Sequence, residues 1–296
     1  MTGVIKKYYG VLTLICVLTG LLFPEFSIFA GYTPLLLALL VFSLVVEHRI
    51  GDFGRIIHHP RFLGMVLAST FLVYPIMGFI FIRILGLGPD LSVGVILLSF
   101  APAPVVAALW TEMSGCDGTP AISAALTSML LSVAVYPLVL YALGVASPVV
   151  AFRVLSLLLF SVFIPSIVAL ILRIEFALVQ PVRYSLNLLS SILGLLIIIV
   201  AVAHMSGSLA GWGVLRVVFL VSVMLLAGFI YGFLVGRRMP EYRVASIYTS
   251  GMRDGMIPVG VALTYFSSAA ALPATLLLVM MPVFTGIVYY LVGSSD

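Results

Sequence analysis

Two apolar segments of this chain are each interrupted in the middle, at corresponding places in its two halves. In the first half, residues 99–104 (Ser-Phe-Ala-Pro-Ala-Pro) divide an apolar run that resumes at Val105. In the second half, residues 249–255 (Thr-Ser-Gly-Met-Arg-Asp-Gly) divide a run that resumes at Met256. Inside a lipid bilayer, non-helical backbone is tolerated only where protein or a water-filled cavity supplies hydrogen-bond partners. If these segments lie in a membrane, the rest of the fold must therefore enclose both interruptions.

Composition and segment length indicate that the segments do lie in a membrane. Of 296 residues, 63% are hydrophobic and 8% are charged, whereas a soluble domain carries about 25% charged residues. A helix needs about 20 apolar residues to cross the hydrocarbon core. The sequence predicts ten spans: 9–23, 33–48, 62–84, 92–113 (interrupted), 119–143, 148–172, 185–204, 214–236, 243–265 (interrupted) and 270–292. The predicted fold class is an all-α membrane protein with a single transmembrane domain over residues 1–296.

Basic residues are unevenly distributed between the two sides of such a protein. The side that holds the N-terminus collects Lys6, Lys7, Arg49, Arg55, Arg61, Arg173, Arg183, Arg237, Arg238 and Arg243. The opposite side collects only Arg83, Arg153 and Arg216. Because cytoplasmic loops carry the excess of Lys and Arg, we expect a multi-pass protein of the cell membrane with both termini in the cytoplasm. The net charge of +4 then reflects membrane orientation, and no nucleic acid is expected as a partner.

Ten spans divide into five and five, and an odd number per half places the second half upside down relative to the first. We therefore predict two inverted five-helix repeats, over about 1–145 and 146–296. The similarity of residues 21–24 (Leu-Leu-Phe-Pro) to residues 162–165 (Val-Phe-Ile-Pro) is consistent with such repeats. The interruptions then fall in the fourth span of each repeat, which are helices four and nine of the chain.

A matched pair of Gly/Pro-interrupted spans is typical of the substrate site of a secondary transporter. Broken helices also form selectivity filters, so a channel is an alternative. An enzyme is not expected, because no Ser and His pair lies at matching depth for a nucleophile and its base. The two cysteines, Cys16 and Cys116, are too few and too far apart to indicate a metal cluster. The sequence thus predicts no catalytic residue, no metal site and no cofactor.

Three stretches resemble one family of transporters. Residues 101–111 (Ala-Pro-Ala-Pro-Val-Val-Ala-Ala-Leu-Trp-Thr) and 118–127 (Gly-Thr-Pro-Ala-Ile-Ser-Ala-Ala-Leu-Thr) look like the fourth and fifth helices of the bile acid:sodium symporter superfamily. Residues 250–255 (Ser-Gly-Met-Arg-Asp-Gly) look like its ninth-helix interruption. The resemblance implies a panel domain and a core domain, crossing of the two interrupted helices near the bilayer midplane, and alternating access. The superfamily also includes arsenite efflux carriers, so efflux of arsenite-like oxyanions or organic acids is a further alternative.

The resemblance also implies candidate ion ligands. The family's fifth-helix Ser and Thr, which help to bind one sodium ion, fall on Ser123 and Thr127. Its ninth-helix Glu, shared between two sodium sites, falls on Thr249, and the Gln and Asn beyond it fall on Arg253 and Asp254. A hard cation prefers several oxygen ligands and usually an anionic one, so the loss of this carboxylate predicts weak sodium coupling. The candidate ion-binding residues are Ser123, Thr127, Thr249 and Asp254, with sodium or a proton as the coupling ion.

Arg253 and Asp254 are charged residues inside a predicted span. A charge at the bilayer centre costs about 2.5–3.5 kcal/mol on insertion scales, so it usually faces a cavity or a partner. Either the two residues belong to an ion pair that ties the interruption together, or Arg253 pairs an anionic substrate while Asp254 binds a proton or positions a cation.

The second interpretation predicts a small organic anion as substrate. A guanidinium binds carboxylate or phosphate through two parallel hydrogen bonds, and the start of the next half-helix, residues 255–257, adds donors toward an anion. The candidate substrate-binding residues are Pro102, Pro104, Thr249, Ser250, Gly251, Arg253 and Asp254. The expected partners are this anion and the lipid bilayer, for a protein that acts as a monomer or a weak homodimer.

Overall fold

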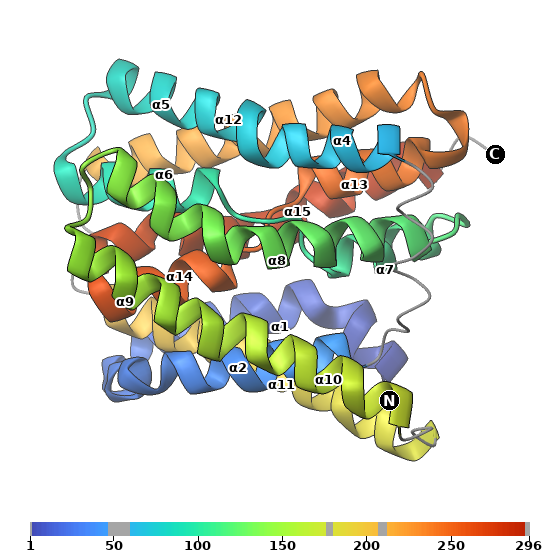
Figure 1. The fold of residues 1–296 in the computed structure, drawn as a ribbon, viewed down its shortest axis with the longest axis horizontal. Coiled ribbons are helices and arrows are strands. Elements are labelled where there is room, and N and C mark those ends of the chain that lie inside the picture. Colours follow the sequence, from blue (N-terminus) through green and yellow to red (C-terminus); the bar gives the residue numbers. More distant parts are fainter. Residues whose placement is uncertain (1, 47–59, 176–179, 207–211, 294–296) are drawn as a thin grey trace.

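The computed structural model of the protein describes residues 2–46, 60–175, 180–206 and 212–293, and every regular element in these ranges is a helix (Figure 1). The first half contains α1 (Thr2–Leu22), the 3-10 helix η1 (Pro24–Tyr32), α2 (Thr33–Val45), α4 (Pro60–Ala68), the π-helical turn η2 (Ser69–Val73), α5 (Tyr74–Leu85), α6 (Pro89–Ser99), α7 (Val106–Met113) and α8 (Thr119–Ala142). The second half contains α9 (Pro148–Leu158), the π-helical turn η3 (Leu159–Phe163), α10 (Ile164–Glu175), α11 (Gln180–Met205), α12 (Trp212–Gly236), the 3-10 helix η5 (Pro240–Tyr242), α13 (Arg243–Gly251), α14 (Met256–Tyr265) and α15 (Ser268–Gly293).

Seven helices within the described ranges are long and apolar enough to cross a membrane. They are Pro24–Val45, Pro60–Leu85, Thr119–Ala142, Pro148–Leu172, Leu188–Met205, Gly213–Gly236 and Ser268–Val292, and each overlaps one predicted span. The first of them begins at Pro24 rather than at residue 33, because η1 runs directly into α2. The predicted span stops short of Glu25 and Gly31, whereas η1 includes both residues. The chain is therefore a multi-pass helical membrane protein.

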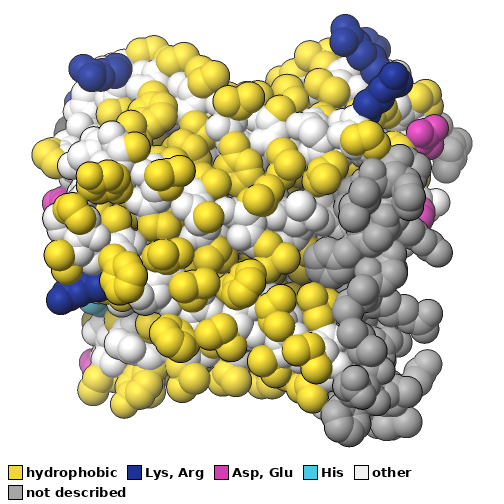
Figure 2. Space-filling view, in the orientation of Figure 1, with side chains coloured by type: hydrophobic (Ala, Val, Ile, Leu, Met, Phe, Trp, Pro, Cys, Tyr) yellow, Lys and Arg dark blue, Asp and Glu magenta, His cyan; other side chains and the backbone are white. Residues whose placement is uncertain are grey.

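The surface has the character expected of a protein surrounded by lipid. Large apolar side chains such as Leu22, Ile28 and Tyr290 are 72–75% exposed. In the space-filling view, hydrophobic side chains spread over the middle of the visible face, whereas the charged side chains that are visible lie toward the two ends of the long axis (Figure 2). So much exposed apolar surface is unfavourable in water and favourable in contact with acyl chains.

Both predicted interruptions are present, and two prolines explain the first of them. Helix α6 ends at Ser99 and α7 begins at Val106, because Pro102 and Pro104 donate no backbone hydrogen bond and disfavour helical backbone in the residue before them. Helix α13 ends at Gly251, and the next residue is extended at φ −96° and ψ 150°. The chain resumes as α14 four residues later, after 252–255.

Two helices that do not break are deformed instead. The long helix from α4 to α5 contains the π-helical turn η2, and the one from α9 to α10 contains η3. Pro75 follows the first turn and Pro165 follows the second. A proline removes one helical hydrogen bond, and a π-helical turn absorbs the local distortion without ending the helix. This matters for function because η2 lies against the second interruption.

The helices form two groups in space. Helices α1, α2, α10 and α11 lie together in the lower part of Figure 1, whereas α4, α5, α12 and α13 lie in the upper part. Helices α8, α14 and α15 lie between the two groups: α8 contacts α4 and α13 of the upper group, α14 contacts α2 and α11 of the lower group, and α15 contacts both α12 and α11. Residues 101–104 of the first interruption are buried, as are Met252, Arg253 and Gly255 of the second, so both interruptions lie inside the fold.

Helix α12 holds α13 very close through three glycines spaced four residues apart. A Cβ atom at Gly232 would collide with the carbonyl oxygen of Ser246, and one at Gly236 would lie 3.1 Å from Cα of Arg243. A Cβ at Gly228 would lie 2.6 Å from the carbonyl oxygen of Ser250. Small residues at this spacing let membrane helices approach backbone to backbone. The second interruption is thereby fixed against α12.

Candidate functional site

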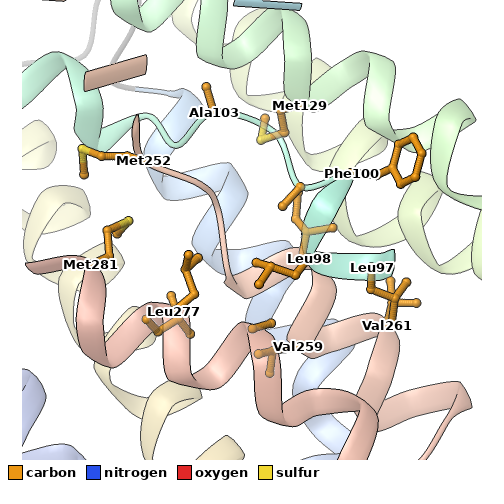
Figure 3. Packing of buried hydrophobic residues seen from close by; sticks show 14 of the residues in the cluster. Leu97, Leu98, Phe100, Ala103, Met129, Met252, Val259, Val261, Leu277 and Met281 are labelled. Carbon is orange, nitrogen blue, oxygen red and sulfur yellow. The ribbon is translucent and has the colours of Figure 1, made fainter. Parts of the chain in front are cut away.

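The two interruptions contact each other through their backbones. The N–H of Asp254 donates a hydrogen bond of 2.8 Å to the carbonyl oxygen of Pro102. Figure 3 shows the same approach, with Ala103 and Met252 on neighbouring non-helical segments. The N–H of Ala103 donates to Oγ of Ser128 on α8 at 3.2 Å, so a side chain from a third segment supports the contact. Two of the predicted substrate-binding residues, Pro102 and Asp254, are thus brought together.

The carboxylate of Asp254 lies at the start of α14. Its Oδ1 accepts a hydrogen bond of 2.8 Å from the N–H of Met256, in the manner of a helix cap. The donors expected at residues 255–257 for an external anion are therefore partly used within the chain, because the N–H of Met256 is bonded to Asp254. The residue as a whole is half-buried.

Arg253 is completely buried, with 0% of its surface exposed. Its Nη2 donates to Oγ of Ser69 at 2.6 Å, and its Nη1 donates to Oγ1 of Thr70 at 3.1 Å. Nη1 also donates to the carbonyl oxygen of Thr249 at 3.3 Å. The guanidinium carbon lies 3.9 Å from the centre of the Tyr74 ring. These contacts join the second interruption to η2 and to the first residue of α5.

The positive charge of Arg253 has no carboxylate partner among the described residues. The partners of its two terminal nitrogens are hydroxyls and a backbone carbonyl, and the carboxylate of Asp254 faces Met256. In the described part of the chain, the ion pair considered in the sequence analysis is therefore absent. Neutral oxygens and an aromatic face offset part of the cost of burying the cation, but they leave its net charge uncompensated.

Three buried polar atoms on this side of the fold have no hydrogen-bond partner among the described residues. They are Oγ of Ser246, Oγ of Ser250 and Nε of Arg253. Ser246 and Ser250 are four residues apart on α13 and share one helix face. Buried polar atoms are usually paired, and an unpaired one costs free energy. A solute that pairs with any of these atoms would recover part of that cost.

The predicted ion ligands have hydroxyls that bond mainly to their own helices. Oγ1 of Thr127 donates to the carbonyl oxygen of Ser123 at 2.8 Å, and Oγ of Ser123 donates to that of Thr119 at 2.9 Å. Oγ1 of Thr249 donates to the carbonyl oxygen of Ala245 at 2.7 Å. In Thr127 and Thr249 these bonds use the hydroxyl protons, and a hydroxyl oxygen that donates its proton can still accept or ligate through its lone pairs. Thr127 belongs to the same helix as Ser128, which supports the first interruption.

Sequence reasoning missed three residues of this site, namely Ser69, Thr70 and Tyr74. They lie within a predicted span that was treated as uniformly apolar. The signal available was a pair of adjacent hydroxyl residues followed by Tyr74 and Pro75. Proline in a span predicts a local deformation of the helix, and deformed turns are frequent at functional sites.

A helical membrane protein with two interrupted segments in contact beside a buried cation has the architecture of a membrane transporter. The chain matches the Sodium Bile acid symporter family over residues 34–212 and belongs to that family. Members of this family are transporters, so the resemblance found in the sequence is confirmed. The match includes the first interruption, Ser123 and Thr127, and it ends before the second interruption. No curated protein matches the chain.

Proposed function

We propose that the protein is a secondary active transporter that moves a small organic anion across the membrane by alternating access. The observation that carries the proposal is the 2.8 Å hydrogen bond from Asp254 to Pro102, which joins the two interruptions beside an uncompensated positive charge. Membership of a transporter family supports the class of function, and the contact between interruptions supports the location of the site. Two broken helices that meet inside a membrane fold are the usual place for a transported solute.

In this proposal the chain crosses the membrane ten times, in two inverted repeats over about 1–145 and 146–296. The order of elements supports it, since an interrupted segment precedes a long helix at the end of each half: α6 and α7 before α8, and α13 and α14 before α15. The interrupted helices four and nine cross at the site. The group formed by α1, α2, α10 and α11 moves as a panel against the remaining helices, and this motion exposes the site to alternate sides.

The substrate contacts residues at the two interruptions, and the positive charge of Arg253 attracts it. The proposed substrate-binding residues are Pro102, Pro104, Thr249, Ser250, Gly251, Arg253 and Asp254. The unpartnered Nε of Arg253 and Oγ of Ser250 support this assignment, because both are buried hydrogen-bond donors. The electrostatic attraction of an anion to a cation is strongest where no other negative charge neutralises that cation.

Coupling to an ion is the remaining part of the proposal. The proposed ion-binding residues are Ser123, Thr127, Thr249 and Asp254, and Asp254 carries a proton or helps to position a cation. Because Thr249 brings no negative charge, we propose that sodium coupling is weak. Asp254 supports the role of proton carrier because it is a half-buried carboxylate at the contact between the interruptions.

Transport by the purified protein in liposomes tests the proposal. A thermal-shift screen of mono- and dicarboxylates first identifies an anion that stabilises the protein, since a ligand at 100 times its Kd stabilises by about 2.7 kcal/mol. Liposomes loaded with this anion should then accumulate the labelled anion by counterflow. Uptake without counterflow would indicate a channel, and no uptake of any stabilising anion would contradict the proposal.

Membrane topology is tested separately by cysteine labelling in a Cys116→Ser background. Arg238→Cys, in the turn after α12, should react with an impermeant reagent only from the cytoplasmic side. Asp90→Cys, at the start of α6, should react only from the outside. Labelling of both residues from one side would contradict the ten-span topology.

A further inference from the structure

We infer that the guanidinium of Arg253 occupies a cation-binding site of the protein, so that the chain carries its own bound cation beside the proposed substrate site. The site, called here the cation cage, consists of Oγ of Ser69, Oγ1 of Thr70, the carbonyl oxygen of Thr249 and the ring of Tyr74. The site binds a monovalent cation, and in this protein the covalently attached guanidinium of Arg253 occupies it. No other residue needs to be invoked to hold it.

The chemistry of the cation cage is that of a cation site rather than of an ion pair. Its oxygens are two hydroxyls and one carbonyl at 2.6, 3.1 and 3.3 Å from the guanidinium nitrogens. Oγ of Ser69 donates its own proton to the carbonyl oxygen of Val66 at 3.1 Å, which directs its lone pairs toward the arginine. The Tyr74 ring closes the cage from the side at 3.9 Å, where the negative face of the ring attracts a cation.

The fold builds this cage from separate segments and holds its parts in place. Ser69 and Thr70 open the π-helical turn η2, which is 183 to 184 residues away from Arg253 in the sequence. Oη of Tyr74 donates to the carbonyl oxygen of Gly251 at 3.1 Å, and this bond fixes the ring beneath the guanidinium. The cage is thus assembled before any solute binds. It has 0% solvent exposure at Ser69, Thr70, Tyr74 and Arg253.

A tethered cation differs from a free one in a way that matters for transport. It cannot dissociate, so it supplies positive charge at the site on every step of the cycle and couples no ion gradient there. This consequence deepens the proposed function and rests on it, because it assigns to a side chain the charge that attracts the anion. The occupancy of the cage itself does not depend on that function and is tested without it.

Chemical rescue tests whether the cage binds a cation. Arg253→Ala removes the guanidinium and leaves all three cage oxygens and the Tyr74 ring. Purified Arg253→Ala protein should melt at a lower temperature than the wild type, and millimolar guanidinium or methylguanidinium chloride should raise its Tm by several degrees. Choline chloride at the same concentration serves as the ionic-strength control. The wild type and Arg237→Ala, which lacks an exposed arginine at the end of α12, should show no such rise.

An equal response of Arg253→Ala and Arg237→Ala to guanidinium would overturn the inference. If Arg253→Ala does not fold, a double-mutant cycle between Arg253→Lys and Ser69→Ala replaces the rescue. A shared site predicts that the two losses in Tm are not additive, whereas additive losses would overturn the inference. Neither readout involves transport, so rescue without anion uptake would leave the cation cage standing and remove the proposed function. Anion uptake by the wild type without rescue of Arg253→Ala would support the proposed function and overturn the cation cage.

Discussion

Asp254 donates its backbone N–H to the carbonyl oxygen of Pro102 at 2.8 Å, while its side chain accepts from the N–H of Met256 at the same distance. One residue therefore connects the two interruptions and starts the half-helix α14. Arg253, its neighbour, turns the opposite way and enters the cation cage. Because the two adjacent residues make different contacts, substitutions of Asp254 and of Arg253 should have different effects.

Asp254→Asn should preserve the fold and change the pH dependence of transport. The amide keeps an oxygen that accepts from Met256 and leaves the backbone bond to Pro102 intact, but it cannot carry a proton. If Asp254 moves a proton, wild-type uptake should increase as the pH falls on the side of the membrane from which the anion is taken up. Uptake by Asp254→Asn should not depend on that pH. Asp254→Ala is the control for the cap and should lose about 1 kcal/mol of stability. An unchanged pH profile in Asp254→Asn would remove the proton from the proposed mechanism.

Arg253→Gln should weaken binding of the anionic substrate. The variant replaces a permanent charge with a neutral amide, and a hydrogen bond to a charged group contributes about 1.5–3 kcal/mol. We therefore expect Kd to increase about tenfold or more, measured by thermal-shift titration and by counterflow. Arg237→Gln, at an exposed position, should bind as the wild type does. Equal Kd values for the two variants would show that Arg253 does not attract the substrate.

Sodium should have little effect on the wild-type protein. Thr249 has no carboxylate with which to bind a free cation. The guanidinium of Arg253 already binds the carbonyl oxygen of Thr249. Uptake of the stabilising anion should be equal in sodium and choline media at matched ionic strength. In Arg253→Ala, where the cage oxygens are free, sodium should raise Tm more than choline does. A steep, saturable sodium dependence of wild-type uptake would contradict this expectation.

Two substitutions at Tyr74 separate its hydroxyl from its ring. Tyr74→Phe loses the bond to the carbonyl oxygen of Gly251 but keeps the aromatic face, so we expect a loss of about 1 kcal/mol. Tyr74→Leu also removes the face beneath Arg253, and a desolvated cation–π contact contributes about 2 kcal/mol. Thermal unfolding in detergent should rank the proteins wild type, Phe variant, Leu variant, from most to least stable. Equal stability of the two variants would show that the ring contact contributes nothing.

Gly232→Ala should destabilise the protein through the position of α13. The added Cβ would collide with the carbonyl oxygen of Ser246, and because that atom belongs to the backbone, α13 must shift away from α12. Overpacking of this kind typically costs about 1–3 kcal/mol. Gly286→Ala in α15 is the matched control, since nothing lies within 4 Å of its added Cβ. A normal Tm for Gly232→Ala would indicate that the two helices separate without strain.

The sequence alone predicted the parts of this protein that depend on local chemistry. Long apolar runs require a membrane because lipid is the only solvent that tolerates them, and seven of the predicted spans are present as long apolar helices. Two prolines two residues apart, Pro102 and Pro104, remove two helical hydrogen bonds within one short stretch, so the first interruption was predictable from the sequence. The second interruption was predictable from Gly251 and Gly255, because glycine is a poor helix former. These effects act over a few residues and need no knowledge of the fold.

Only the tertiary structure decided which side chains meet. Ser69 and Thr70 look like ordinary small residues of an apolar span, and nothing in their own segment indicates that they bind Arg253. The choice between an ion pair and a neutral cage depended on where α13 lies against η2 and α12, which is set by the close approach at Gly228 and Gly232. Hydrophobic periodicity places residues along a segment, whereas a hydrogen bond between residues 184 positions apart depends on how whole helices pack.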